Sequence, residues 1–294
     1  VSNAIAGAFQ SYGGELRTEA GVDRIIVRNG KARGVGLENG DEIPANIIVS
    51  AMDVKRTFLN CMDRSDVDED FYERVENFKI RGSSGKLNIA LDGLPTFPAL
   101  PEGSSLHISD MHFIDSMVRM ERAYDDWKAG TWSKDPYIDM VIPTTVDPTM
   151  APPGKHFMSC FIQYCPHKLE GRDWTDPERE AFAQTVIDQI ANYSPDFRDL
   201  IVHYEVRTPA DIEEQIGITE GNIFHGELTM DQLLFNRPVP GYAQYRAPVA
   251  GLYMCGSSTH PGGGVMAAPG ANAAREILAD LKRPNTVPEN FGDD

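Results

Sequence analysis

The segment GLYMCGSSTHPGGGVMAAPGANAAREIL, residues 251 to 278, constrains the fold more than any other stretch of the chain. It predicts a short apolar strand, a glycine-rich loop and a helix that begins near Ala267. Pro269 fits the first turn of that helix, because the N–H that proline lacks would have no intrahelical partner there. Gly262 to Ala267 also satisfies G-x-G-x-x-A, the dinucleotide-binding fingerprint.

The surroundings of this fingerprint argue against a nucleotide domain that begins here. A Rossmann fingerprint follows the first strand directly and leads through a helix to a second strand with an acidic residue. Here GSSTHP separates the apolar run from the glycines, and only NTVPENFGDD follows the predicted helix. We therefore interpret the match as accidental. The alternative is that strand, loop and helix close a nucleotide domain, with Gly256 and Gly262 to Gly264 allowing backbone to approach a ligand.

The first 55 residues predict a helix followed by a β-meander. Apolar side chains recur at helical spacing before Gly13, where the helix is expected to end. Asn-Gly pairs at 29–30 and 39–40 separate β-rich runs, which is a strong hairpin signal. The uniformly apolar run within NIIVSA is typical of a strand buried on both faces.

The middle of the chain predicts a separate substrate or cap domain. Helices are expected in DEDFYERVENF and at 110–130 and 177–192, and strands in KLNIALDGLP, PYIDMVIPT, HFMSCFIQY and LIVHYEVRT. Long helices between isolated strands favour a mixed sheet with helices over one face, so the expected class is α/β with mixed α+β character. The expected divisions are 1–55 and 246–283 as parts of a Rossmann-like domain, 56–245 as the substrate domain and 284–294 as a tail.

Composition argues against several partners. The net charge of −17 and the absence of clustered Lys and Arg argue against nucleic acid. No apolar run reaches about eighteen residues, so no transmembrane helix is expected, and peripheral membrane contact is left open. The cysteines form no C-x-x-C pair, which argues against dithiol chemistry and favours a reducing compartment, the cytoplasm or, in a eukaryote, the mitochondrial matrix. His107 and His112 have the wrong spacing for metal ligands, so no metal site is expected.

The closing segment closely resembles the C-terminal signature of the phytoene desaturase-like FAD-dependent oxidoreductases, in particular the branch of pyridine nucleotide-disulfide oxidoreductase domain-containing protein 2. GNIFHGELTMDQLLFNRPVPGYAQYR and GVDRIIVRNGKARGVGLENGDEIPANIIVSAMD are similar to the same family, so the resemblance spans nearly the whole chain. Family members open with a Gly-rich βαβ finger that holds the FAD pyrophosphate, and nothing before residue 13 resembles it. The resemblance therefore implies the C-terminal portion of such an enzyme, which on its own is expected to retain little or no flavin.

The resemblance also implies where FAD would lie. Gly256 would approach the phosphate and ribityl region, and the loop at 259–264 would pass beside the isoalloxazine ring. The N–H groups of Val265 and Met266, at the start of the helix, would face flavin N1 and the C2 carbonyl, where positive potential stabilises a reduced flavin. The cofactor-binding residues implied in this way are Val22, Asp53, Gly256, Thr259, Pro261, Gly262, Gly263, Gly264, Val265 and Met266.

Three polar residues are candidates for chemistry or substrate binding. His260 is interpreted either as an acid or base or, preferably, as a loop residue that shapes the flavin edge. His225 either faces a substrate cavity or caps a turn. Arg237 either binds an anionic group of the substrate or pairs at the surface.

The leading hypothesis is an FAD-dependent oxidoreductase that transfers hydride from a small lipophilic molecule, apolar or carbonyl-bearing, to flavin. The chain alone is not expected to be competent. The alternative is a non-enzymatic binding or interaction module derived from such a flavoprotein. A third hypothesis, an NAD-dependent enzyme built on Gly262 to Ala267, needs a strand after residue 285 that the sequence lacks. Substrate, electron acceptor and oligomeric state are left open.

Overall fold

The computed structural model describes residues 1–101 and 110–282, which divide into two compact units. The first unit joins Val1–Phe78 to the described residues from Leu228 onward, and the second is Lys79–Glu227. The predicted divisions fell at 55/56 and 245/246. The cofactor and substrate roles given to those domains stay predictions, because compactness alone identifies no ligand. None of the described helices is long and apolar enough to cross a membrane.

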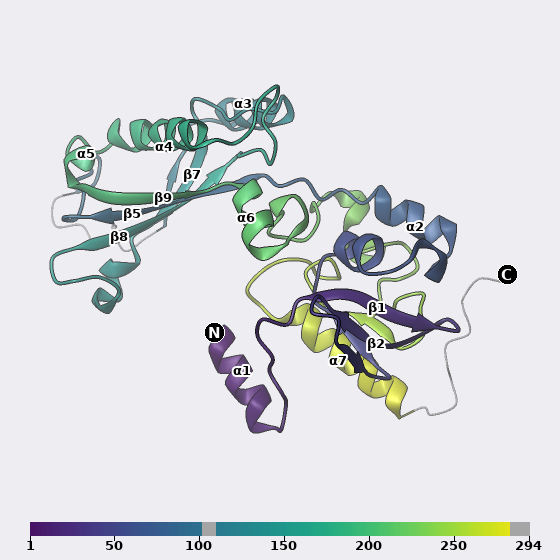
Figure 1. The fold of residues 1–294 in the computed structure, drawn as a ribbon. Coiled ribbons are helices and arrows are strands. Elements are labelled where there is room, and N and C mark those ends of the chain that lie inside the picture. Colours follow the sequence, from purple (N-terminus) through teal and green to yellow (C-terminus); the bar gives the residue numbers. More distant parts are fainter. Residues whose placement is uncertain (102–109, 283–294) are drawn as a thin grey trace. The chain divides into compact units, whose positions relative to one another are not determined.

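The first unit contains two small sheets and three α-helices among its described residues (Figure 1). Its elements are α1 (Ser2–Ser11), β1 (Val22–Arg28), β2 (Lys31–Leu37), β3 (Glu42–Pro44), β4 (Ile48–Ser50), a π-helical turn η1 (Arg56–Asn60), η2 (Arg64–Asp66), α2 (Glu69–Glu76), η7 (Met230–Gln232), η8 (Leu234–Asn236), β10 (Leu252–Met254) and α7 (Ala268–Leu281). The antiparallel sheet β1-β2-β3 is the predicted meander. Asn29 and Gly30, with φ of 53° and 68°, form its two-residue hairpin turn.

The second sheet of this unit pairs β4 with β10 in parallel, and Leu252 lies opposite Ile48. Strands were predicted at both places. The expectation that β4 is buried on both faces is wrong, since the Val49 side chain is 44% exposed. β4 has a single partner in this sheet, and it is β10 that is buried along its length.

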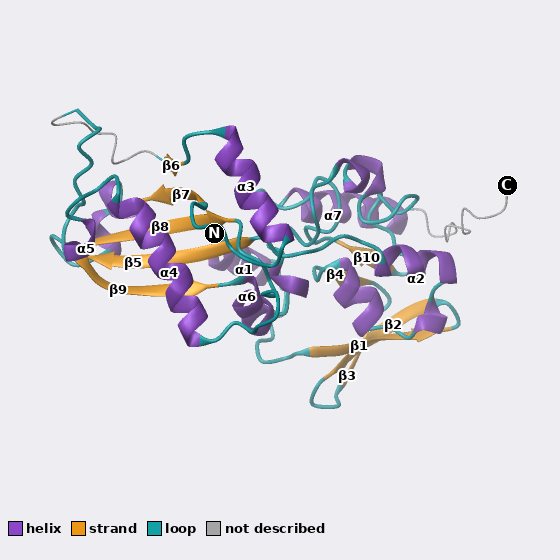
Figure 2. Cartoon of the chain, turned by 90° about the horizontal axis from the view of Figure 1, so that it is seen from above, coloured by secondary structure: helices purple, strands orange, loops and turns teal. Residues whose placement is uncertain are grey.

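The second unit is built on a five-stranded sheet of order β6-β7-β8-β5-β9. Its elements are β5 (Ser84–Leu91), β6 (Met111–Phe113), α3 (Met117–Lys128), β7 (Tyr137–Val141), η4 (Pro143–Thr145), η5 (Pro148–Met150), β8 (His156–Gln163), α4 (Asp176–Ala191), α5 (Phe197–Leu200), β9 (Ile201–Arg207), α6 (Pro209–Ile216) and η6 (Thr219–Gly221). Helices α3, α4 and α5 lie over one face of the sheet, as Figures 1 and 2 show from two directions. This arrangement confirms the α/β class with mixed α+β character and helices over one face.

Two details of the second unit differ from expectation. Every pairing among the five described strands is antiparallel, so the sheet is not mixed. The helix expected across 110–130 begins only at Met117, because 111–113 pairs with β7 as a strand that buries Phe113. The Ser116 hydroxyl caps α3 by accepting from the Arg119 N–H at 3.3 Å.

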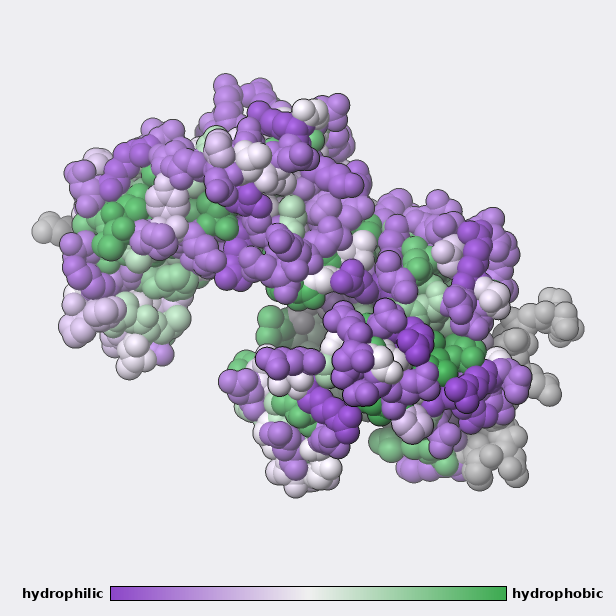
Figure 3. All heavy atoms as spheres, in the orientation of Figure 1, coloured by the Kyte–Doolittle hydropathy of each residue, from purple (hydrophilic) through white to green (hydrophobic). Residues whose placement is uncertain are grey.

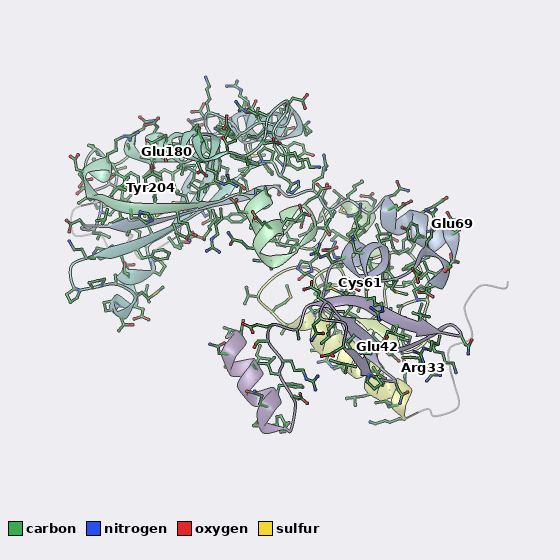
Figure 4. The ribbon with its side chains drawn as sticks, viewed as in Figure 1. Arg33, Glu42, Cys61, Glu69, Glu180 and Tyr204 are labelled. Carbon is green, nitrogen blue, oxygen red and sulfur yellow. The ribbon has the colours of Figure 1, made fainter. Side chains whose placement is uncertain are left out.

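Alternating side chains of the sheet build the core of the second unit against α4. Leu87 and Ile89 on β5 and Ile162 on β8 are fully buried, and they pack in one cluster with Phe182 and Val186 of α4. Tyr204 of β9 donates to Glu180 of α4 at 2.7 Å, so a polar link also ties helix to sheet (Figure 4). The face drawn in Figure 3 is mostly hydrophilic, in keeping with 24% charged residues.

Leu87→Ala is expected to destabilise the second unit by about 2–5 kcal/mol, because Leu87 is fully buried and its loss leaves a cavity. All three tryptophans, Trp127, Trp132 and Trp174, lie in this unit, so urea unfolding followed by tryptophan fluorescence reports on it. The control Val202→Ala shortens an aliphatic side chain of β9 that is 63% exposed, and should change stability by roughly 0.5 kcal/mol or less. Equal effects of both substitutions would contradict the assigned core.

Candidate functional site

The carboxyl ends of β4 and β10 meet at one edge of their parallel pair. The Cys255 N–H donates to the Ser50 carbonyl at 2.8 Å, which extends the pairing by one residue. At Gly256 an ideal Cβ would lie 2.4 Å from the Ala51 carbonyl oxygen. Glycine is therefore required here because the two backbones approach too closely for any side chain.

Beyond this edge, Asp53 and Ser258 satisfy the backbone of the turn after β4. Ser258 accepts from the Val54 N–H at 3.0 Å, and Asp53 accepts from the Arg56 N–H at 2.9 Å. Asp53 is only 2% exposed and Ser258 is fully buried. The adenosine contact predicted for Asp53 stays a prediction, but a structural role as a turn cap is visible. Sequence reasoning missed Ser258, whose only signal was a small hydroxyl residue two positions after Gly256.

Arg237 fixes the start of the glycine-rich loop. Its Nε and Nη2 both donate to the Ser257 carbonyl, at 3.0 and 2.8 Å. The side chain is fully buried, so the surface-pairing alternative is wrong, and burial lowers the pKa of the guanidinium to about 10. An ideal Cβ on Gly262 would lie 3.6 Å from Arg237 Nε, which places the guanidinium directly behind the loop. A substrate contact for Arg237 stays a prediction.

The loop from 259 to 262 is held by hydrogen bonds to its own backbone and to Tyr245. The Thr259 hydroxyl donates to the Gly256 carbonyl at 2.8 Å, and the Gly262 N–H donates to the Thr259 carbonyl at 2.8 Å. Tyr245, 8% exposed, donates to the His260 carbonyl at 2.9 Å. The sequence did not single out Tyr245. These hydrogen bonds hold the path of the loop around His260 and Pro261.

The tip of the loop is open to solvent and leads into α7. Val265 is 96% exposed and Met266 is 52% exposed. The Met266 N–H donates to the Gly264 carbonyl at 2.9 Å, so a ligand acceptor would have to compete with this turn for that N–H. Gly264, with φ of 143°, supplies a conformation that other residues rarely adopt. The predicted start of the helix near Ala267 is confirmed, with Pro269 in its first turn.

An ion-pair cluster anchors α7 beside β10. Arg246 donates to both carboxylate oxygens of Asp280 at 2.8 Å and to Glu276 at 2.7 Å. Tyr253 of β10 donates to the same Asp280 at 2.8 Å. Burial, followed by this hydrogen bond, raises the pKa of Tyr253 to about 12. The C-terminal end of α7 is therefore tied to β10 and to the segment before it.

The remaining predicted residues lie elsewhere. Val22 begins β1, where it pairs with Leu37 and is 37% exposed. His225 lies in the second unit, where its backbone N–H donates to the Asn222 carbonyl at 2.8 Å in a tight turn. The structure thus brings together the predicted residues from 256 to 266 with Asp53 and Arg237, while His225 belongs to another unit. His107 lies outside the described residues.

Sequence comparison finds similarity to an oxidoreductase domain-containing protein and to a desaturase. No protein-family model matches the chain. It is 38% identical over 290 residues to pyridine nucleotide-disulfide oxidoreductase domain-containing protein 2 of Mus musculus, covering 96% of this chain and 50% of that protein. It is 25% identical to the lycopene-forming phytoene desaturase of Pseudescherichia vulneris, covering 95% of this chain and 53% of the desaturase. The chain thus spans about half the length of the curated relatives it matches, and the predicted resemblance is confirmed.

Solved structures support the fold. An oxidoreductase from Methanosarcina mazei aligns with a TM-score of 0.53 at 15% identity, covering 94% of this chain and 53% of that one. A putrescine oxidase variant aligns with a TM-score of 0.54 at 13% identity, covering 94% and 51%. At these identities the likeness concerns the fold alone.

Gly256→Ala is expected to destabilise the β4–β10 pair by about 1–3 kcal/mol, because its methyl group would overlap the Ala51 carbonyl. Hydrogen exchange measured by mass spectrometry should show faster exchange in peptides that contain β4 and β10. The control Gly270→Ala adds a methyl group in α7 with no atom within 4 Å, and should stabilise the helix by up to about 1 kcal/mol. Unchanged exchange in the Gly256 variant would contradict the close approach.

Proposed function

We propose that this chain contributes one part of the FAD site of a phytoene desaturase-like oxidoreductase, and that the whole enzyme transfers hydride from a small organic molecule to flavin. The observation that carries the proposal is the parallel β4–β10 edge, where Gly256 allows close backbone approach and the loop leads into the N-terminus of α7. Similarity over 96% of the chain to an oxidoreductase domain-containing protein supports it.

The loop suits a flat, partly anionic ligand. Gly262 and Gly264 have φ of 104° and 143°, so they present backbone without a side chain in conformations that glycine favours. The α7 N-terminus adds partial positive charge, and Arg237 adds a buried guanidinium behind Ser257. Positive potential of this kind stabilises negative charge on a bound ligand. When bound, FAD would supply the hydride acceptor that no amino-acid side chain offers.

Within this site the residues of the chain position the loop and the ligand, and they take no part in the reaction itself. Arg237 and Tyr245 hold the carbonyl groups of Ser257 and His260, which fixes the loop in one path. The His260 imidazole would border the ligand and exclude water from its edge. We favour this role over proton transfer, in line with the modest proton chemistry that hydride transfer to flavin needs.

Exposed apolar side chains in the first unit support a site that is completed by more polypeptide. Helix α1 buries none of its residues, and Ile5 and Phe9 are 57% and 51% exposed. Val265, at the loop tip, is 96% exposed. In our proposal these side chains contact the part of the enzyme that corresponds to the other half of the relatives' length, which also holds the FAD pyrophosphate.

The test compares two proteins, the 294-residue chain and the full product of its gene with any upstream coding sequence. The full product should purify yellow with the visible absorbance of bound flavin. FAD titrated into the 294-residue chain should bind more weakly than micromolar. A colourless full product that does not take up added FAD would instead favour a non-enzymatic binding module.

Arg237→Met is expected to weaken FAD binding to the full product about tenfold or more, because the Ser257 carbonyl loses two charged donors and the loop loses its support. Flavin fluorescence gives the affinity, and hydrogen exchange of a peptide over 255–267 reports on the loop. The matched control Arg122→Met removes an exposed arginine of α3 in the second unit and should change neither measurement. Normal affinity with a loosened loop would show that Arg237 serves folding alone.

A further inference from the structure

The five-stranded sheet of the second unit has a polar face opposite the helices, which we call the open face. Because side chains alternate along a strand, Leu87 and Ile89 point into the core while Lys86 and Asn88 point to the other side. Strand register fixes their neighbours. The residues opposite or beside them on this face are Ser159 and Phe161 of β8, Glu205 and Arg207 of β9, Asp139 of β7 and His112 of β6.

The Lys86 ammonium is partly buried and has more N–H donors than its hydrogen bonds to described residues use. Its Nζ donates to the Ser159 hydroxyl at 2.5 Å, and Ser159 is only 9% exposed. An ammonium group carries three N–H donors. Within residues 1–101 and 110–282, this is the one hydrogen bond that the ammonium makes. The neighbouring Arg207, in contrast, is engaged by Glu205 through two hydrogen bonds.

Asn88 is the complementary acceptor. Its Oδ1 is buried and accepts no hydrogen bond from any described residue. A buried acceptor without a partner costs about 1–3 kcal/mol, so the site favours a ligand that brings a donor. Lys86 and Asn88 lie two positions apart on one strand, roughly 7 Å along it, and Ser159 lies directly opposite Asn88. Both side chains therefore lie on one face of β5, within the span of one small polar group.

The open face also carries polar side chains on β6 and β7. An aromatic ring on β8 lies between these side chains and Lys86. Tyr137 and His112 share a hydrogen bond of 2.5 Å, and Asp139 lies opposite His112 across the strands. Burial, with the nearby Asp110 carboxylate, raises the pKa of Asp139, while His112 and Lys86 oppose this rise. Phe161 lies between Asp139 and Lys86 in the register. The face thus offers an apolar ring beside paired donor and acceptor groups.

We propose that the open face binds the polar end of a small molecule that carries a carbonyl oxygen next to an N–H or O–H donor, as in a carboxamide or a hydroxy acid. The carbonyl oxygen accepts from Lys86, the adjacent donor binds Asn88 Oδ1, and the apolar body lies on Phe161. A plain hydrocarbon satisfies neither polar group. Calling this ligand the substrate rests on the proposed function, but its binding needs no flavin.

The test titrates three probes of similar apolar body into the isotope-labelled 294-residue chain: hydrocinnamamide, phenyllactate and propylbenzene. Backbone amide resonances of Lys86, Asn88 and Ser159 report binding by NMR. The amide and the hydroxy acid should shift these resonances and bind about tenfold or more tightly than propylbenzene. The arm that binds more tightly identifies which donor the face prefers. Equal affinity for propylbenzene would overturn the proposal.

Two variants and a matched control locate the site. Lys86→Met and Asn88→Leu should each weaken binding of the preferred polar probe about tenfold. Lys155→Met makes the same exchange at an exposed lysine of the same unit and should leave affinity unchanged. Tryptophan fluorescence during urea unfolding checks that each variant folds. Undiminished affinity in folded Lys86 and Asn88 variants would also overturn the proposal.

Failure of this inference and failure of the flavin proposal are separate results. Probe binding at the open face alongside a colourless full product would reject the redox function and keep the ligand site. A yellow full product whose open face ignores the polar probes would keep the flavoprotein and reject the ligand class.

Discussion

The parallel pairing of β4 and β10 is the constraint on which the first unit depends. Two short strands from distant parts of the sequence lie side by side, and the approach at Gly256 leaves no space for a side chain. Once this edge exists, the turn after β4 receives Ser258 and the loop after β10 receives Arg237. The Arg246–Asp280 pair then holds α7 in place. The geometry of the loop therefore depends on this backbone contact together with the side chains that hold the loop.

Local structure was largely predictable from the sequence, because its causes are local. The Asn29-Gly30 turn specifies its hairpin through positive φ, and Pro269 marks the first turn of α7. The antiparallel order of the larger sheet was not predictable, because strand order is decided by packing between distant segments. The short strand at 111–113 was hidden by a helical pattern that continues into α3.

The candidate site shows the same division. Glycines at 256 and 262 were identifiable, since close approach and positive φ leave a compositional trace. The burial of Arg237 was not, because a charged residue before proline is usually expected at the surface. Tyr245 and Ser258 act through single hydrogen bonds to backbone atoms, and such contacts leave no spacing pattern. The residues that support a loop are thus harder to predict from the sequence than the residues that form it.

The discontinuity of the first unit has a consequence for the order in which the protein forms during translation. The hydrogen bond from Val54 to Ser258 joins residues 204 positions apart, whereas the second unit is one continuous segment, Lys79–Glu227. Long-range pairing is slow because a large loop must close first, and domains generally form as their own residues leave the ribosome. All residues of the second unit are therefore synthesised before β10, the partner strand of β4. Until β10 is synthesised, β4 is an unpaired edge that can pair with other chains.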